Sequence, residues 1–199
     1  MHLSTAEEMD LFSSESLTTK QITAEVCVHH LWFTDADYAE KGALIKCNPA
    51  VKSEHDRDAL RKALSDGKID VVATDHAPHA LDEKLRPYTK SASGMPLVQH
   101  SLLAMLELSK QGVFSLPLVV QKMCHNPADL FAIRNRGYIR KGYYADLVVV
   151  DLQKNTEVSK NTILYKCGWS PFEGTTFSAS VEKTFLNGCC VYDNGTILD

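Results

Sequence analysis

The residues best suited to chemistry follow the apolar run at 69–72. The chain continues Ala-Thr-Asp-His-Ala-Pro-His, which places Asp75, His76 and His79 directly behind an expected buried strand. A carboxylate beside a divalent metal can be a ligand and can also take a proton from an attacking water. Asp75 is therefore predicted to be a metal ligand and catalytic base rather than only the cap of a turn. His76 and His79 are expected to support it or to contact a substrate.

Three other positions carry polar groups near expected strands or turns. His2 precedes a capped helix predicted over about 6–13, and it is either an idle surface residue or an imidazole ligand. His29 and His30 follow a strand predicted over 21–26. Adjacent side chains on extended backbone point in opposite directions, so at most one of the pair can face a site, and a structural role is favoured for the pair, with one histidine supporting the site. Asn48 precedes a proline and either reads a substrate carboxylate or carbonyl or shapes a turn.

The elements that position these groups alternate between strands and helices. Besides the strands at 21–26 and 69–74, the patterns predict helices over 54–65, 97–110 and 116–124 and a short one behind Asn126-Pro127. The polar segment 81–94 is expected to be a mobile loop over a site. From about residue 137 only short strands remain, at 145–151, 181–186 and 190–192. We expect a barrel-like part over 1–136 and a small all-β part over 137–199.

Composition excludes several classes of function. The 199 residues are 44% hydrophobic and 23% charged with a net charge of −4, so no basic stripe suits nucleic acid. No apolar run approaches the ~20 residues that span a bilayer, and the first residues do not resemble a signal peptide. The six cysteines show no metal-binding spacing and are expected to be reduced. These features predict a cytoplasmic protein that acts on a small molecule.

Several segments together resemble the dihydroorotases of the amidohydrolase superfamily. The heptapeptide 73–79 is similar to the segment that follows the family's eighth barrel strand, and residues 2–8 are similar to its sixth-strand His followed by Ser-Thr-Ala. Residues 23–31 resemble the seventh-strand segment, although Cys27-Val28 stands where the family usually has Thr-Pro. The stretches 126–137 and 142–151 resemble the return to the family's β-sandwich. The closing Trp-Ser-Pro-Phe-Glu-Gly at 169–174 favours dihydroorotase over related enzymes.

The resemblance implies an α/β fold: the C-terminal portion of a (β/α)8 TIM-like barrel, about strands 6–8, followed by a small β-sandwich segment. It implies one or two zinc ions, with His2 and Asp75 as ligands and Asp75 as the base. Other positions would contact the pyrimidine substrate or support the ligands: Asn48, His79, Gly94, His76 and His30. The implied reaction is the reversible cyclisation of N-carbamoyl-L-aspartate to L-dihydroorotate in pyrimidine biosynthesis.

The chain also departs from the family pattern. The family's His-x-His pair, its bridging lysine or carboxylate and its fifth-strand histidine have no counterpart among the 199 residues, while a (β/α)8 barrel takes ~250 residues. We therefore expect a fragment, or a subunit completed by a second chain or a homodimer, that is inactive alone. The alternatives are a dihydropyrimidinase- or allantoinase-type cyclic amidohydrolase and a non-catalytic scaffold derived from the barrel.

Overall fold

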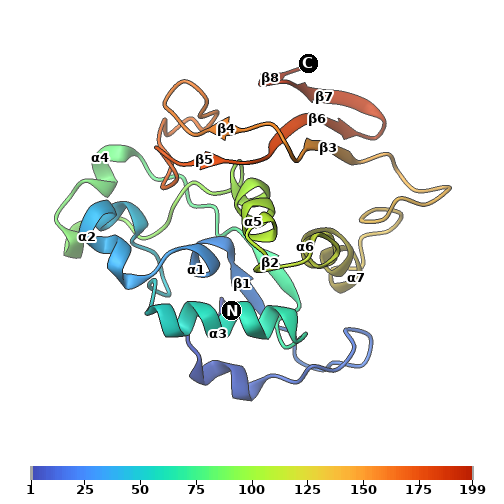
Figure 1. Ribbon diagram of the computed structural model, residues 1–199, viewed down its shortest axis with the longest axis horizontal. Helices are drawn as coiled ribbons and strands as arrows, with labels where there is room; N and C mark the ends of the chain where they lie inside the picture. The colour runs from blue at the N-terminus through green and yellow to red at the C-terminus, as the bar shows by residue number, and fades with distance from the viewer. Residues whose placement is uncertain (1, 199) are drawn as a thin grey trace.

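A short parallel sheet forms the centre of the computed structural model, which describes residues 2–198 (Figure 1). Strand β1 (Glu25–Cys27) pairs in parallel with β2 (Val71–Ala73), so that Cys27 stands opposite Ala73. His2 forms a parallel bridge to Glu25 on the other side of β1. The segments at His2, β1 and β2 therefore run side by side in one direction, as expected of an α/β fold.

Helices surround this sheet. The α-helices are α1 (Val28–Trp32), α2 (Tyr38–Lys41), α3 (Glu54–Ser65), α4 (Leu81–Lys84), α5 (Ser101–Lys110), α6 (Leu116–Val120) and α7 (Asn126–Leu130). Shorter 3-10 turns cover Glu7–Leu11, Asp35–Asp37, Gly42–Ile45 and Tyr88–Lys90, and a π-helical turn covers Gln121–His125. Across residues 2–198, none of the helices has the length and apolar character needed to cross a membrane.

Helix α3 has the bounds that the sequence predicts. Its first turn is closed by Ser53, whose hydroxyl accepts a hydrogen bond from the Asp56 amide, while the Asp56 carboxylate accepts one from the Ser53 hydroxyl. Leu60, Ala63 and Leu64 lie on the buried face. The same carboxylate accepts a hydrogen bond from the Ala6 amide at 2.9 Å, which ties the segment behind His2 to this helix.

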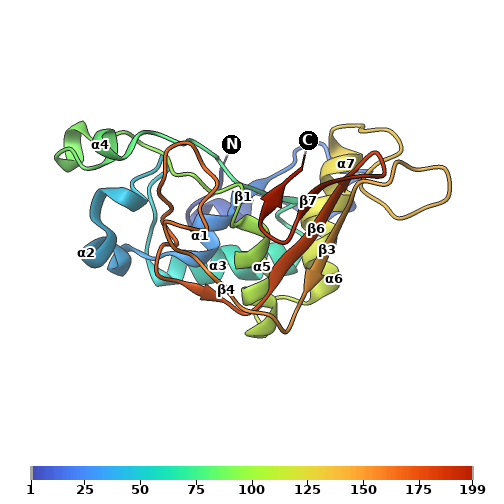
Figure 2. The ribbon, with the colours of Figure 1, turned by 90° about the horizontal axis from the view of Figure 1, so that it is seen from above.

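The C-terminal part consists of short strands, as expected, and they pair in an antiparallel manner. Its main sheet has the order β3 (Leu147–Asp151), β6 (Ser180–Leu186), β7 (Cys189–Asp193) and β8 (Thr196–Ile197), and β4 (Thr156–Glu157) pairs with β5 (Thr176–Phe177). The β6–β7 hairpin turns at Asn187-Gly188, where both residues have positive φ, as a two-residue turn of this kind requires. Figures 1 and 2 show this part along one side of the helices. The division near residue 137 stays a prediction.

One hydrophobic core joins the two parts of the chain. The ring of Trp32 on α1 packs edge-on against Phe172 at 5.5 Å and Phe177 at 5.7 Å between ring centroids. Phe172 and Phe177 are fully buried. The Trp-Ser-Pro-Phe-Glu-Gly segment singled out in the sequence therefore supplies part of this core.

Several expected elements differ in extent or kind. The helix expected over 6–13 is the 3-10 turn Glu7–Leu11, and only half of the expected capping box forms, with Glu8 accepting hydrogen bonds from the amides of Ser4 and Thr5. The strand expected over 21–26 is only β1, and the helix expected over 97–110 begins at Ser101. The helix expected over 116–124 turns π-helical after Val120.

The prediction that His29 and His30 lie on extended backbone is wrong. Strand β1 ends at Cys27 and α1 begins at Val28, so both histidines occupy the first turn of a helix. Successive side chains diverge by about 100° on a helix instead of 180° on a strand, so the two rings lie on neighbouring sides, with centroids 4.2 Å apart. Both are buried.

A buried ion pair secures the start of the parallel sheet. Lys20 donates to Asp70 at 2.8 Å and also to the carbonyls of Gly67 and Lys68. The other oxygen of Asp70 accepts a hydrogen bond from the Ala24 amide, just before β1. Lys20 and Asp70 are 9% and 3% exposed, so the two charges depend on one another.

Acid is expected to destabilise the fold before most carboxylates titrate. Burial lowers the pKa of His30 and of His100 to about 4, whereas an unfolded histidine titrates near 6.5. The folded state therefore holds both rings neutral while the unfolded state binds protons, so stability is complete above pH ~6.5 and falls as the pH drops toward 4. The loss is of the order of 3 kcal/mol for each ring. Urea unfolding between pH 4 and 7.5 measures it.

The His100→Gln variant separates this cause from general acid effects. It should flatten the acid limb of the stability curve, whereas the exposed His55→Gln control should leave its slope unchanged. Equal slopes in the wild type and His100→Gln would contradict the assignment.

Candidate functional site

The structure brings His2 and Asp75 together at the parallel sheet. The Nε2 atom of His2 lies 3.4 Å from an Asp75 carboxylate oxygen, and its Nδ1 atom lies 2.8 Å from Glu25 Oε1. The three side chains come from three neighbouring segments of the sheet: the start of the chain, β1 and the end of β2. His2 and Asp75 are about one-quarter to one-third exposed, so a small molecule can reach them.

Glu25 is a site residue that the sequence analysis missed. A carboxylate inside the otherwise apolar run Ala24-Glu25-Val26 was the available signal, because a charged residue in a buried strand usually has a specific partner. Carboxylates beside an imidazole fix its orientation and tautomer when the other ring nitrogen binds a metal. Glu25 Oε1 lies beside one ring nitrogen of His2, and Asp75 lies beside the other.

Asp75 adopts a backbone conformation that is rare for its type. Its φ is +47°, in the left-handed region, where Asp and Asn occur more often than other non-glycine residues. The turn begins where β2 ends, and the His76 amide bonds back to the Thr74 hydroxyl at 3.2 Å. This turn ends the strand abruptly and sends the carboxylate toward His2, rather than along the strand direction.

His76 and His79 are held by different partners. The Nδ1 atom of His76 accepts from the amides of Leu97 and Val98, and its ring lies 5.3 Å from that of Tyr165. His79 Nε2 lies 3.0 Å from the Ser93 carbonyl, while its own carbonyl accepts from the Trp169 indole. The structure thus directs His76 toward the start of α5 and His79 toward the 92–94 loop.

Gly94 allows that loop to approach His79. Its φ is +127°, and a Cβ atom added there would lie 2.4 Å from the Ala77 side chain and 3.4 Å from the His79 ring. Only glycine fits without displacing neighbouring atoms. The Gly94 amide donates to the Lys46 carbonyl, two residues before the exposed Asn48, so the segments of Asn48, His79 and Gly94 adjoin.

Lys84, also missed from the sequence, ties these segments together. It is fully buried on α4, and its ammonium group donates to the carbonyls of Lys46, Ala92 and Gly94 at 2.8–3.0 Å. Burial lowers the pKa of Lys84 to about 8. The segment 81–94 therefore contains helical turns and an internal anchor, and its mobility stays a prediction.

His30 lies deeper than the His2–Asp75 pair. Its Nε2 atom is 3.0 Å from the Pro49 carbonyl and 4.0 Å from the Cys47 sulfur. It therefore contacts the two neighbours of Asn48 in the chain.

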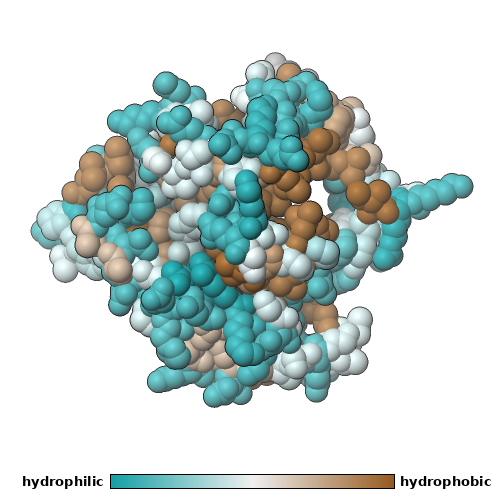
Figure 3. Space-filling view, in the orientation of Figure 1, coloured by the Kyte–Doolittle hydropathy of each residue, from teal (hydrophilic) through white to brown (hydrophobic). Residues whose placement is uncertain are grey.

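A wide groove lies elsewhere on the molecule. It has a volume of about 820 Å³ and runs between the start of α5 and the antiparallel sheet, lined in part by Leu102, Val148 and Val181. Figure 3 shows apolar side chains on the face where β3 and α6 lie in Figure 1, where Val148, Val149 and Val120 are exposed. Neither His2 nor Asp75 lines this groove, so the polar residues identify the candidate site better than cavity size does.

Comparison with known proteins shows the family to which the sequence belongs. Residues 2–191 match the amidohydrolase family. The dihydroorotase of Pyrococcus furiosus is 34% identical over 197 residues, which are 99% of this chain and 45% of that protein. The dihydroorotase of Endomicrobium trichonymphae is 34% identical over 192 residues, 96% of this chain and 46% of that protein. The resemblance to the dihydroorotases is confirmed, and the chain spans about half the length of these relatives.

Solved structures agree on the fold. The L-hydantoinase (dihydropyrimidinase) from Arthrobacter aurescens superposes with a TM-score of 0.91 and 28% identity, over 100% of this chain and 45% of that one. The dihydropyrimidinase from Brevibacillus agri superposes with a TM-score of 0.87 at 22% identity, which bears on the fold alone. The family match covers both the segment of His2 and the turn of Asp75. The chain belongs to the amidohydrolase family.

Proposed function

We propose that the protein is part of a zinc-dependent cyclic amidohydrolase of the dihydroorotase type. The observation that carries this proposal is the 3.4 Å approach of His2 Nε2 to the Asp75 carboxylate at the ends of adjacent parallel segments. Both dihydroorotases described above align with almost the whole chain. The substrate would be L-dihydroorotate, or N-carbamoyl-L-aspartate in the direction of ring closure.

The residues present fit part of a zinc site. An imidazole nitrogen and a carboxylate oxygen are common zinc ligands, and His2 Nε2 faces an Asp75 oxygen at 3.4 Å while Glu25 lies 2.8 Å from the other ring nitrogen of His2. Bound zinc would polarise the amide carbonyl and make a water molecule acidic at neutral pH.

Asp75 would move the proton. Its carboxylate would accept a proton from the attacking water and return it to the ring nitrogen as the amide bond breaks. Glu25, which lies beside the His2 ring, would hold that ring in place. The strained turn at Asp75 fixes the direction of the carboxylate, so little reorganisation would be needed during the reaction.

Substrate contacts would come from the adjoining segments beside this pair. Asn48 is exposed and offers an amide that could bind a carboxylate or carbonyl of the pyrimidine ring. His79 and the backbone at Gly94 would close another side, with Lys84 fixing the spacing between the two segments. His76 and His30 would support these segments rather than touch the reacting atoms.

The remaining zinc ligands would come from outside the described residues. The chain covers 45–46% of the relatives' lengths, so the rest of a complete site would be supplied by further sequence or by a complementing chain, including a second copy. The 199 residues alone are expected to be inactive. The division into a barrel part, 1–136, and a β-sandwich part, 137–199, belongs to this proposal.

A hydantoinase- or dihydropyrimidinase-type activity is the second candidate. It is favoured by the TM-score of 0.91 with the Arthrobacter aurescens L-hydantoinase (dihydropyrimidinase), at 28% identity. Both candidates open a cyclic amide by the same chemistry and differ in the substituents of the ring. A non-catalytic scaffold would keep the fold and lack turnover.

Turnover by a completed enzyme tests these alternatives. Residues 2–198 would replace the matching part of the Pyrococcus furiosus dihydroorotase, and the zinc-loaded chimera would be assayed with dihydroorotate, dihydrouracil and hydantoin. We expect hydrolysis of dihydroorotate with a kcat/KM at least tenfold above that for the other two. Preference for dihydrouracil or hydantoin would assign the second candidate, and a folded chimera without turnover on any of them would overturn the proposal.

A further inference from the structure

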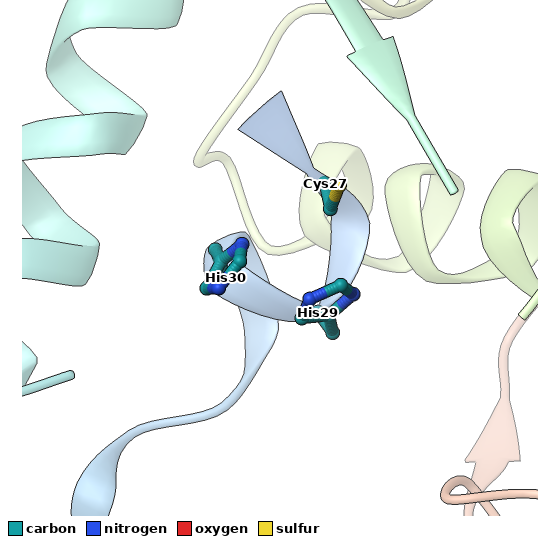
Figure 4. A group of neighbouring side chains, drawn as sticks. All are labelled: Cys27, His29 and His30. Carbon is teal, nitrogen blue, oxygen red and sulfur yellow. The ribbon is translucent and has the colours of Figure 1, made fainter. Parts of the chain in front are cut away.

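A second group of metal-binding side chains lies inside the chain. Cys27 ends β1, and His29 and His30 lie on the first turn of α1 (Figure 4). Each offers one ligand atom, and these three atoms all lie within 4.8 Å of one another. All three residues are buried, and none of them belongs to the His2–Asp75 pair.

The two imidazoles have unused polar atoms. Among residues 2–198, neither ring nitrogen of His29 has a hydrogen-bond partner, and the Nδ1 atom of His30 has none. His29 is only 1% exposed, so water does not reach these atoms from the surface. A buried polar atom without a partner costs about 1–3 kcal/mol, which makes two such rings side by side an unusual arrangement.

Their protonation state suits metal binding rather than an ion pair. Burial lowers the pKa of both histidines, so each ring is neutral at physiological pH and keeps one lone pair free. For His30, Nε2 is engaged by the Pro49 carbonyl, which acts as an acceptor, so the ring proton lies there and the lone pair lies on Nδ1. That nitrogen is one of the unpartnered atoms.

We propose that Cys27, His29 and His30 form a site for a thiophilic metal ion, Cu⁺ or Zn²⁺. A thiolate with two imidazoles is a ligand set that both ions accept. On binding, the Cys27 thiol would lose its proton to solvent, and the sulfur and two nitrogens would each donate a lone pair. The bound group would be neutral with Cu⁺ and carry one positive charge with Zn²⁺, and the neutral form suits a site without solvent better.

The site would act on structure rather than on the reaction. It joins the end of β1 to the start of α1, the junction at which the chain leaves the sheet beside Glu25. A bound ion would therefore fix this junction and stabilise the folded state by mass action. The inference does not depend on the proposed hydrolase activity.

Cobalt absorption tests for sulfur ligation. Co²⁺ bound by a thiolate shows an intense near-ultraviolet charge-transfer band, which a site made only of nitrogen and oxygen ligands lacks. The test uses the full 199-residue chain as a His2→Gln, Asp75→Asn double variant, which removes the other candidate ligands. We expect one equivalent of Co²⁺ with this band, its loss in Cys27→Ser, and its retention in the exposed-thiol control Cys124→Ser.

Competition identifies the ion, and thiol labelling guards against misfolding. Zn²⁺ should displace Co²⁺ and abolish the band, or Cu⁺ should be retained at one equivalent against a chromogenic chelator. Retention of neither ion would overturn the proposal.

In the wild type, a bound ion should reduce the rate at which a thiol reagent labels Cys27 by at least tenfold and leave the labelling rate of Cys124 unchanged. His29→Gln should abolish that protection, and a band that survives in Cys27→Ser would also overturn the site.

Discussion

Asp75→Asn in the completed enzyme should lower kcat for dihydroorotate by about 10²–10⁴-fold, the usual contribution of a general base. An amide cannot accept the proton from water, and it is a weaker metal ligand than a carboxylate. Asn tolerates the left-handed backbone that φ +47° requires, so the turn should keep its shape. Steady-state hydrolysis, with zinc content measured on the same samples, checks the effect.

A nearby carboxylate provides the control for Asp75→Asn. Asp82→Asn makes the same chemical change on the exposed face of α4 and should leave kcat within twofold of the wild type. Unchanged turnover in Asp75→Asn, at normal zinc content, would show that another group moves the proton. Loss of turnover together with loss of zinc would assign Asp75 mainly as a ligand.

Lys20→Met should destabilise the folded chain by about 3–5 kcal/mol, because it leaves the buried carboxylate of Asp70 without its partner. Methionine fills a similar volume, so the loss comes from charge rather than from a cavity. Asp70 also accepts a hydrogen bond from the Ala24 amide, so its displacement would disturb the approach to β1. Chemical denaturation at pH 7 measures the change.

Two further variants isolate the buried pair. Lys62→Met removes an ion pair to Asp66 on the surface of α3, where Lys62 is 75% exposed, and should cost under about 1 kcal/mol. Adding Asp70→Asn to Lys20→Met should recover part of the lost stability, because a neutral amide is easier to bury. Equal effects of Lys20→Met and Lys62→Met would mean that water still solvates Asp70.

Elements with strong local signals could be predicted from the sequence. The observed bounds of helix α3 equal the predicted ones, because Ser53 and Asp56 form a capping box and the apolar positions follow a helical period. The strands expected over 181–186 and 190–192 are close to β6 and β7, because each is a short run of strand-forming residues that ends at a turn. By contrast, the first turn of α1 interrupts an apolar run that reads as a strand, so the placement of His29 and His30 was predicted wrongly.

The distances between the site residues could not be predicted from local sequence patterns. The sequence marked both His2 and Asp75, yet they are separated by more than seventy residues, and only the parallel pairing around β1 shows their proximity. Glu25 had a local signal, a carboxylate within an apolar strand, but that signal does not name its partner, and Lys84 looks like an ordinary charged residue of a polar segment. Their partners are distant side-chain or backbone atoms, which no local pattern specifies.

The three carbonyls around Lys84 also bear on how the two segments beside the site can move. If the 92–94 loop swung outward alone, the ammonium would keep one of its three acceptors while still shielded from water. Lys46 lies between Ile45 and Cys47, which are buried in the core, so its carbonyl stays in place and holds α4 and the 92–94 loop against it through Lys84. The two segments are therefore expected to keep a fixed spacing, so that their contacts with a bound molecule would change together rather than independently.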